Sequence, residues 1–152
     1  MQLNLYTYKA IVQSVYDGDT CTVDIDLGLR TWVHDEKLRL ARINAPEVRG
    51  EEREAGLRSR DFLRSKIDGQ KIVVETIKDQ KGKYGRYLAE IWLEDGDDTW
   101  VNVNDLLVQD GIVIPLVQRG VVSVHANNLL GVRPNTWDSD LWNIGDWVRT
   151  IR

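Results

Sequence analysis

Three short segments of the sequence combine charged side chains with sharp turns, and chemistry could occur in them. They are DGDT at residues 17–20, LRLARINAPE at 38–47 and KYGR at 83–86. Each has an ordinary structural explanation when taken alone, since Asp-Gly is a common hairpin turn and clustered charges often form only a solvated face. Their combination is what indicates a site.

The oxygen and guanidinium groups in these segments suit a phosphate ester. Asp19, Asn44 and Glu47 supply hard oxygen ligands of the kind that Ca²⁺ prefers. Arg39 and Arg86 supply planar guanidinium groups that match phosphate oxygens. A hard cation and arginines stabilise charge on a phosphodiester while a carboxylate activates water, so this set predicts phosphoryl-transfer chemistry.

The sequence around these residues predicts strands that are interrupted by one helix. Alternating, β-branched sequence predicts strands over residues 5–15, 21–27, 32–43, 71–77 and 86–93. Helical spacing predicts a helix over 51–67 and a short one that begins near Asn102 or Asn104 and ends at Gly111. This order predicts an α+β fold, mainly β: a five-stranded OB-type barrel with a helix between strands 3 and 4 and a short helix after strand 5.

The same patterns predict which faces point inward. In the strand over 32–43, Leu38 and Leu40 share the inner face and Arg39 lies on the opposite face, toward a surface or cleft. The predicted inner side of the helix over 51–67 comprises Ala55, Phe62, Leu63 and Ile67.

The composition excludes several classes of protein. The chain has 152 residues, 42% of them hydrophobic, which is enough for one domain with its own core. Cys21 is the single cysteine, which excludes a disulfide scaffold and a cysteine zinc cluster. No apolar run reaches the roughly 18 residues of a membrane span, and the first residues lack the features of a signal peptide. A cytoplasmic protein without a membrane partner is expected, unless a leader was removed from the chain.

The net charge of −4 argues against a broad nucleic-acid surface, because phosphate backbones are bound by lysine and arginine. The charge is unevenly distributed, however. Residues 37–90 contain 14 Lys and Arg against 9 Asp and Glu, and the rest of the chain is acidic. We therefore expect affinity for a polyanion to be confined to one cleft.

Five segments, in order and spacing, resemble the thermonuclease (staphylococcal nuclease-like) family. They are VYDGDTCTV at 15–23, LRLARINAPE at 38–47, EAGLRSRDFLR at 54–64, GKYGRYLAEIWLEDG at 82–96 and VNDLLVQDG at 103–111. The resemblance covers about residues 8–115. It implies an OB barrel with an inserted helix and a Ca²⁺-dependent nuclease activity.

The resemblance implies a calcium site with two departures from the family pattern. It implies that the side chains of Asp19 and Asn44 and the carbonyl of Ala45 bind the ion. The family more often has aspartate at position 44, so Asn44 removes one negative charge and predicts weaker calcium binding. Ala45 replaces a common threonine, which costs little if only its carbonyl is used.

The resemblance also implies the residues that act on the substrate. Glu47 matches the glutamate proposed to activate the attacking water. Arg39 and Arg86 match the phosphate-binding arginines, and Lys83 and Tyr84 match the lysine and tyrosine that flank the nucleotide's phosphate.

The last part of the chain departs most from the family. We expect residues 1–116 to form the nuclease-like domain and residues 117–152 to form a tail with Trp137, Trp142 and Trp147. These tryptophans either dock on the barrel or form a base-stacking or protein-binding patch. The tyrosines that contact the base in well-known members are absent from IVIPLV at 112–117, and the oligomeric state is open.

The sequence thus predicts a Ca²⁺-dependent nuclease that hydrolyses DNA and RNA with little sequence preference. The alternative is a non-catalytic OB-fold module that binds nucleic acid or protein, with Asn44 as the sign of a weakened metal site. A decayed site would be expected to lose some of its charged residues. The presence of Asp19, Arg39, Glu47 and Arg86 together favours the enzyme.

Overall fold

The computed structural model of the chain describes residues 5–116. The strands are β1 (Thr7–Asp17), β2 (Thr20–Asp26), β3 (Trp32–Leu40), β4 (Ile43–Asn44), β5 (Lys71–Lys81), β6 (Tyr87–Glu94), β7 (Trp100–Asn102) and β8 (Ile114–Pro115). The helical elements are a short 3-10 turn, η1 (Gly50–Glu52), and two α-helices, α1 (Arg53–Ile67) and α2 (Val103–Gln109).

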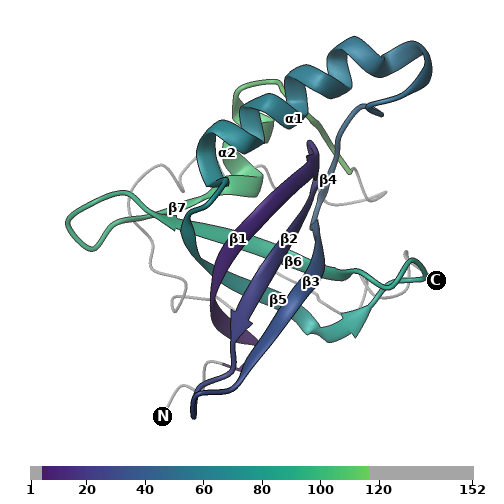
Figure 1. The fold of residues 1–152 in the computed structure, drawn as a ribbon. Coiled ribbons are helices and arrows are strands. Elements are labelled where there is room, and N and C mark those ends of the chain that lie inside the picture. Colours follow the sequence, from purple (N-terminus) through teal and green to yellow (C-terminus); the bar gives the residue numbers. More distant parts are fainter. Residues whose placement is uncertain (1–4, 117–152) are drawn as a thin grey trace.

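Five of these strands close into a barrel. Antiparallel pairing runs in the order β3-β2-β1-β5-β6, and the parallel pairing of β3 with β6 closes the ring. Figure 1 shows α1 across one end of this barrel, next to the turn between β1 and β2. The predicted five-stranded OB-type barrel, with α1 between the third and fourth barrel strands and α2 after the fifth, is confirmed.

The core follows the alternation of the strands. Leu38 and Leu40 are fully buried, whereas the intervening Arg39 lies on the opposite face with its side chain 17% exposed, as predicted. The remainder of the core comes mainly from apolar residues of β1, β2, β5 and β6 together with Leu63, Ile67 and Leu107 of the two helices. Burial of these side chains provides the main driving force for folding.

The inner face of α1 differs from the prediction. Its buried residues are Gly56, Ser59, Leu63 and Ile67, whereas Ala55 and Phe62 are only half-buried. The prediction followed apolar side chains, but the first half of the helix packs against backbone and therefore presents small residues there. Leu63 and Ile67 are confirmed as core residues.

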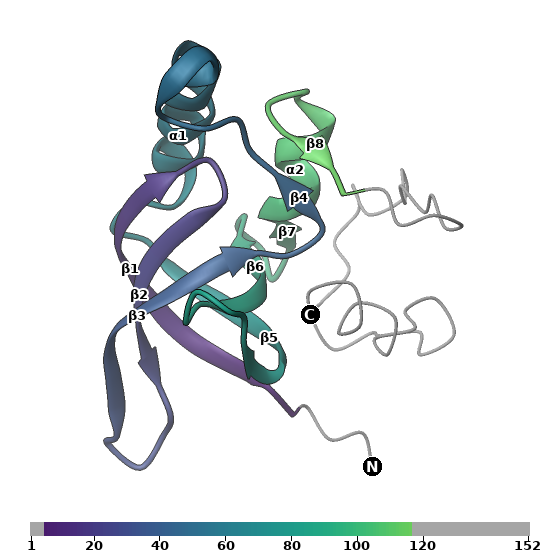
Figure 2. The same cartoon turned by 90° about the vertical axis from the view of Figure 1, so that its right-hand side faces the viewer.

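The segment after β3 is also different from the prediction. The expected strand over 32–43 ends at Leu40 because Arg42 adopts a left-handed conformation with φ of 65° and turns the chain. A two-residue strand, β4, follows this turn and pairs with β8, and the amide of Leu116 donates to the carbonyl of Arg42 at 2.8 Å. Figure 2 shows this pair beside α2. Neither β4, β8 nor β7 was predicted as a separate strand.

Local contacts explain two further element boundaries, the end of β5 and the start of α2. β5 continues to Lys81 rather than ending at Ile77, because Lys81 pairs with Tyr87 across a bulge. Helix α2 begins where the sequence indicates, since the Asn102 side chain caps it by accepting a hydrogen bond from the amide of Asp105 at 3.0 Å.

Within residues 5–116 no helix is long and apolar enough to cross a membrane. The predicted tail over 117–152, with its three tryptophans, lies outside the described residues, so its packing and the proposed domain boundary stay predictions.

Candidate active site

The turn between β1 and β2 presents a buried carboxylate. Gly18 and Asp19 form the two-residue connection, and the amide of Asp19 donates to the Asp17 side chain at 3.0 Å. The Asp19 carboxylate is held from two sides. Its Oδ2 accepts from the amide of Ala45 at 2.8 Å, and its Oδ1 accepts from the hydroxyl of Thr20 at 3.1 Å. The first bond fixes the turn to the loop that follows β4.

Burial has an electrostatic consequence for this carboxylate. It raises the pKa of Asp19 to about 6, although the positive charge of Arg39 and the Ala45 amide both act to lower it. A nearby cation would stabilise the charged form of this buried carboxylate, because it would compensate for the hydration that the carboxylate loses on burial.

Arg39 is anchored at four acceptors around the bend after β3. Its Nη1 donates to the carbonyls of Leu40 and Ile43 at 2.9 and 3.0 Å. Its Nη2 donates to Asn44 Oδ1 and lies beside Asp19 Oδ2, at 3.1 Å in each case. Arg39 therefore joins two of the predicted metal ligands in one network.

The loop between β5 and β6 carries the other predicted substrate-binding residues. The left-handed conformation of Gly85 makes a tight turn possible, in which the amide of Gly82 donates to the carbonyl of Arg86 at 2.8 Å. The Tyr84 ring is 70% exposed and lies 4.8 Å from the Lys83 ammonium and 5.5 Å from the Arg86 guanidinium. This geometry is that of cation–π contacts.

Thr20 connects this loop to the turn that carries Asp19. Its hydroxyl oxygen accepts from Arg86 Nη1 at 3.1 Å while its hydrogen is donated to Asp19. Sequence reasoning missed Thr20, although it stands in the DGDT segment directly after Asp19.

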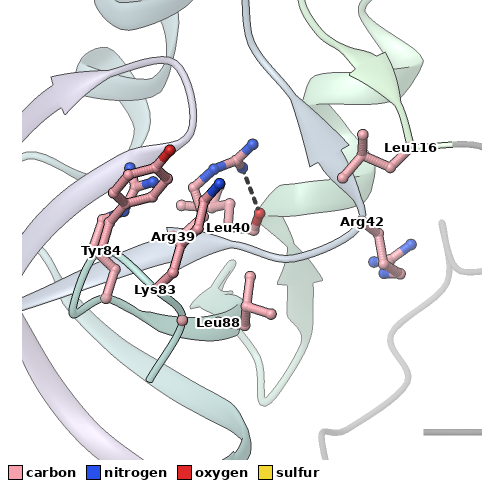
Figure 3. A pocket seen from close by; sticks show the side chains of 9 residues that line it. Arg39, Leu40, Arg42, Lys83, Tyr84, Leu88 and Leu116 are labelled. Carbon is pink, nitrogen blue, oxygen red and sulfur yellow. Dashed lines mark hydrogen bonds between the residues drawn. The ribbon is translucent and has the colours of Figure 1, made fainter. Parts of the chain in front are cut away.

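Arg39 and the side chains of the β5–β6 loop line a pocket of about 240 Å³ (Figure 3). In Figure 3, Lys83 and Tyr84 lie on one side of the pocket and Leu116 on the other. The lining combines predicted charged residues with apolar ones from β3, β6 and the end of the described chain: Arg39, Leu40, Arg42, Gly82, Lys83, Tyr84, Arg86, Leu88 and Leu116. The structure thus brings four of the predicted site residues into one pocket.

The other predicted residues lie outside this lining. Asp19 and Asn44 connect to it through Arg39, and Ala45 connects through Asp19. Glu47 is exposed, and its charge acts on the guanidinium of Arg39. Its amide donates to the Glu52 carboxylate at 3.2 Å, which ties this loop to η1.

The donor set around Asp19 suits a hard cation in kind but is low in charge. The candidate ligands are a carboxylate, an amide oxygen and a carbonyl, all oxygen donors of the type that calcium accepts. Within residues 5–116 no cluster of three or more His, Cys, Asp or Glu side chains is placed to hold a metal ion. An ion at this site would therefore rely on neutral oxygens and water for most of its coordination.

Comparison with known proteins places this chain in a family. The protein-family model described as "Staphylococcal nuclease homologue" matches residues 37–133, which is more than half of the chain. The protein therefore belongs to the staphylococcal nuclease family. The match extends past residue 116, where we placed the predicted domain boundary.

Two individual relatives carry the name thermonuclease. The chain is 32% identical over 112 residues to the thermonuclease of Staphylococcus hyicus, covering 72% of this chain and 59% of that protein. It is 32% identical over 88 residues to the thermonuclease of Staphylococcus intermedius, covering 56% of this chain and 49% of that protein. The chain thus spans between about half and three fifths of the length of these relatives.

Proposed function

We propose that this protein is a Ca²⁺-dependent nuclease that hydrolyses phosphodiester bonds of DNA and RNA with little sequence preference. One observation carries the proposal: Arg39 and Arg86 line one pocket, and each is bonded to the network around the Asp19 carboxylate. Such a pairing of phosphate-binding cations with a candidate metal ligand is what phosphodiester hydrolysis needs. Membership of the staphylococcal nuclease family and the names of its relatives support it.

The residues of the pocket take complementary roles in this proposal. The guanidinium groups of Arg39 and Arg86 hold the scissile phosphate and stabilise the charge that builds on its oxygens. Lys83 and Tyr84 flank the phosphate from the β5–β6 loop. The exposed Glu47 carboxylate accepts a proton from the attacking water.

The metal site supports the same reaction. We expect Asp19, Asn44 and the carbonyl of Ala45 to hold calcium. When bound, the ion supplies Lewis-acid stabilisation of a phosphate oxygen. Because this site has one carboxylate among its three protein ligands, we expect calcium affinity to be modest.

The apolar part of the pocket lining supports cleavage with little sequence preference. Leu40, Leu88 and Leu116 contribute apolar surface that can contact a base or sugar without reading a hydrogen-bonding pattern. Contacts to phosphate position a nucleic acid but carry no sequence information. We therefore expect cleavage of many sequences.

The decisive experiment uses the full chain with single-stranded DNA and, separately, RNA. Each substrate is incubated with millimolar Ca²⁺ or with a chelator. We expect degradation with calcium and none with chelator. Binding without degradation would instead favour a non-catalytic OB-fold module. In that interpretation, Asn44 is the sign of a weakened metal site.

Variants then assign the roles. Glu47→Gln and Arg86→Ala should each reduce the cleavage rate by about 100- to 1,000-fold, because each removes one preorganised electrostatic group. Glu94→Gln and Arg58→Ala serve as matched controls, since both side chains are exposed and neither lines the pocket. Turnover close to that of the wild type in folded Glu47→Gln or Arg86→Ala, with folding checked by circular dichroism, would overturn the assignment.

A further inference from the structure

Gly18 and Gly56 are glycines for reasons of space rather than of backbone conformation. Neither has a positive φ, so any residue could adopt their backbone conformation. By contrast, Gly28 and Gly69 have positive φ and open space around the position of a Cβ atom. What Gly18 and Gly56 provide is the absence of a side chain.

Both positions mark a close contact between α1 and a segment of the candidate site. A Cβ atom on Gly18 would overlap the hydroxyl of Ser59 and would lie 2.8 Å from the Cβ of Ala45. A Cβ atom on Gly56 would overlap the carbonyl of Glu47 and would lie 2.7 Å from the amide of Val48. One turn of the helix therefore touches the segment that carries Asp19 and the segment that carries Glu47.

Ser59 provides a second and independent observation. Its side chain is fully buried, and its hydroxyl has no hydrogen-bond partner within the described part of the chain. A buried hydroxyl without a partner opposes folding, so stability alone would favour alanine at this position. The hydroxyl lies between Gly18 and α1, where it fills the space that separates the Asp19 turn from the helix.

The helix is also fastened to the strand that leads into this turn. Arg64 Nη2, five residues after Ser59 in α1, donates to the carbonyl of Val15 at 3.0 Å. This hydrogen bond opposes sliding of the helix along β1.

We infer that Gly56 and Ser59 are positioning residues, which set the placement of the Glu47 segment and of the Asp19 turn against one rigid helix. The inference rests on the proposed function, because it assigns Glu47 and Asp19 their catalytic and metal-binding roles. Residues that orient a metal ligand or a catalytic group can each account for 10- to 100-fold in affinity or activity. A displacement of about 1 Å can cost about 100-fold in rate.

The first test separates the two contacts by their readouts. Gly56→Ala should lower kcat by about 100-fold while changing KM and Ca²⁺ affinity little, because it displaces the Glu47 segment. Gly18→Ala should weaken Ca²⁺ binding, measured by titration calorimetry, by about 10-fold, because it displaces the Asp19 turn. Val74→Ala, a core truncation in β5, controls for loss of stability and should leave both constants near those of the wild type.

The second test asks for rescue. Ser59→Gly removes the hydroxyl and Cβ that Gly18→Ala would meet. The double variant Gly18→Ala/Ser59→Gly should therefore bind Ca²⁺ about 3-fold more tightly than Gly18→Ala, as expected for two residues in direct contact, although the 2.8 Å approach to the Cβ of Ala45 remains. Failure of this rescue in folded protein would overturn the assignment of Ser59.

The third test sets stability against Ca²⁺ affinity. Ser59→Ala should unfold at the same temperature as the wild type or higher, because it removes an unsatisfied hydroxyl, yet weaken Ca²⁺ binding by about 10-fold. Ser65→Ala, on the exposed side of the same helix, should change neither. A merely structural serine would give Ca²⁺ affinity that follows stability, and wild-type Ca²⁺ affinity in Ser59→Ala would overturn the inference.

The two proposals can fail separately. A wild-type chain that does not degrade nucleic acid refutes the proposed nuclease, while the calorimetric arms with Ca²⁺ alone still test the contact of Gly18 with Ser59. A nuclease in which both Gly56→Ala and Gly18→Ala keep wild-type constants refutes only the positioning role. Ser59→Ala removes one atom without adding any, so it tests the inference even if Gly18→Ala does not fold.

Discussion

Arg39 and Arg42 lie three residues apart and line the same pocket, yet their guanidinium groups have different partners. Arg39 is held mainly by neutral acceptors, two carbonyls and an amide oxygen, with Asp19 as its one carboxylate. Arg42 is held by two carboxylates. Its Nε and Nη2 donate to Glu90 at 2.6 and 2.7 Å, and its Nη2 also contacts Asp105 at 2.8 Å.

The pKa values reflect this difference. Burial lowers the pKa of Arg39, and Asp19 only partly offsets that effect. Burial alone would also lower the pKa of Arg42, but Glu90 and Asp105 raise it well above its ordinary range. The positive charge of Arg42 is thus compensated by carboxylates within the protein. The guanidinium of Arg39 is held mainly by neutral oxygens, so more of its positive charge remains available to attract an anionic ligand.

An arginine in the lining of a pocket is thus not by itself a substrate-binding residue. In Figure 3 the guanidinium of Arg42 points away from that of Arg39. Asn102 donates to the same Glu90 carboxylate at 2.9 Å, which joins the turn after β3 to the start of α2. We therefore propose that Arg39 binds the substrate and that Arg42 stabilises this junction.

Removal of Arg42 should have the largest effect on stability. Arg42→Ala leaves the buried Glu90 carboxylate without its cation, and breaking a buried ion pair in this way costs about 3–5 kcal/mol. We expect that loss in the free energy of unfolding by urea, with cleavage per folded molecule nearly unchanged. In the control Arg58→Ala, which breaks an exposed helix pair with Glu54, the change should be at most about 0.5 kcal/mol. A small loss in Arg42→Ala would remove the distinction between the two arginines.

Replacement of Arg39 by lysine should affect activity most. Arg39→Lys keeps the positive charge but loses the planar group that reaches several acceptors at once. We expect kcat to fall by about 100- to 1,000-fold. Arg42→Lys is the matched control and should lower stability while leaving kcat near that of the wild type. Equal kcat losses in both lysine variants would contradict the division of roles.

A carboxylate at position 44 should strengthen the metal site. Asn44→Asp places a second negative charge next to the Arg39 guanidinium and the Asp19 carboxylate. Even in a largely solvated environment an added charge close to a divalent ion is worth more than 1 kcal/mol, so we expect Ca²⁺ affinity to rise by about 10-fold. Titration calorimetry of the free protein measures it, with the exposed Gln70→Glu as control. An unchanged affinity would show that residue 44 does not contact the ion.

The smallest effect should come from an exposed pair on the outer face of the barrel. The backbone amide of Asp35 and then the His34 side chain hold the pKa of Asp24 below its ordinary value. A carboxylate with a lowered folded-state pKa stabilises the fold above its ordinary pKa and loses this contribution as the pH falls. Asp24→Asn should therefore lower the melting temperature slightly at pH 7, and this difference should shrink as the pH falls below about 4. A difference that grows toward acid would contradict this sign.

The sequence predicted those parts of the fold and of the site that depend on local alternation and on the spacing of motifs. The barrel strands, the inserted helix and the inward direction of Leu38 and Leu40 all follow from local periodicity. Four residues of the pocket lining came from segments recognised by their charges and turns, namely Arg39, Lys83, Tyr84 and Arg86.

What could not be predicted depends on residues that meet only in the folded chain. Arg42 and Glu90 are 48 positions apart, and nothing local marks them as partners. The approach of α1 to the Asp19 turn makes Ser59 an inner residue, although periodicity favoured Ala55 and Phe62. A two-residue strand such as β4 leaves too few positions for an alternating pattern to be recognised.

The pairing of β4 with β8 has a consequence for how the chain is made. Residue Asn44 pairs with Ile114, and Leu116 contributes to the lining of the pocket. A ribosome synthesises the DGDT turn early, but the pocket also requires residues 114–116, which are synthesised about 100 residues later. A nascent chain therefore cannot present the complete cleft until this segment has emerged, and a fragment that stops before residue 114 would lack one wall of it.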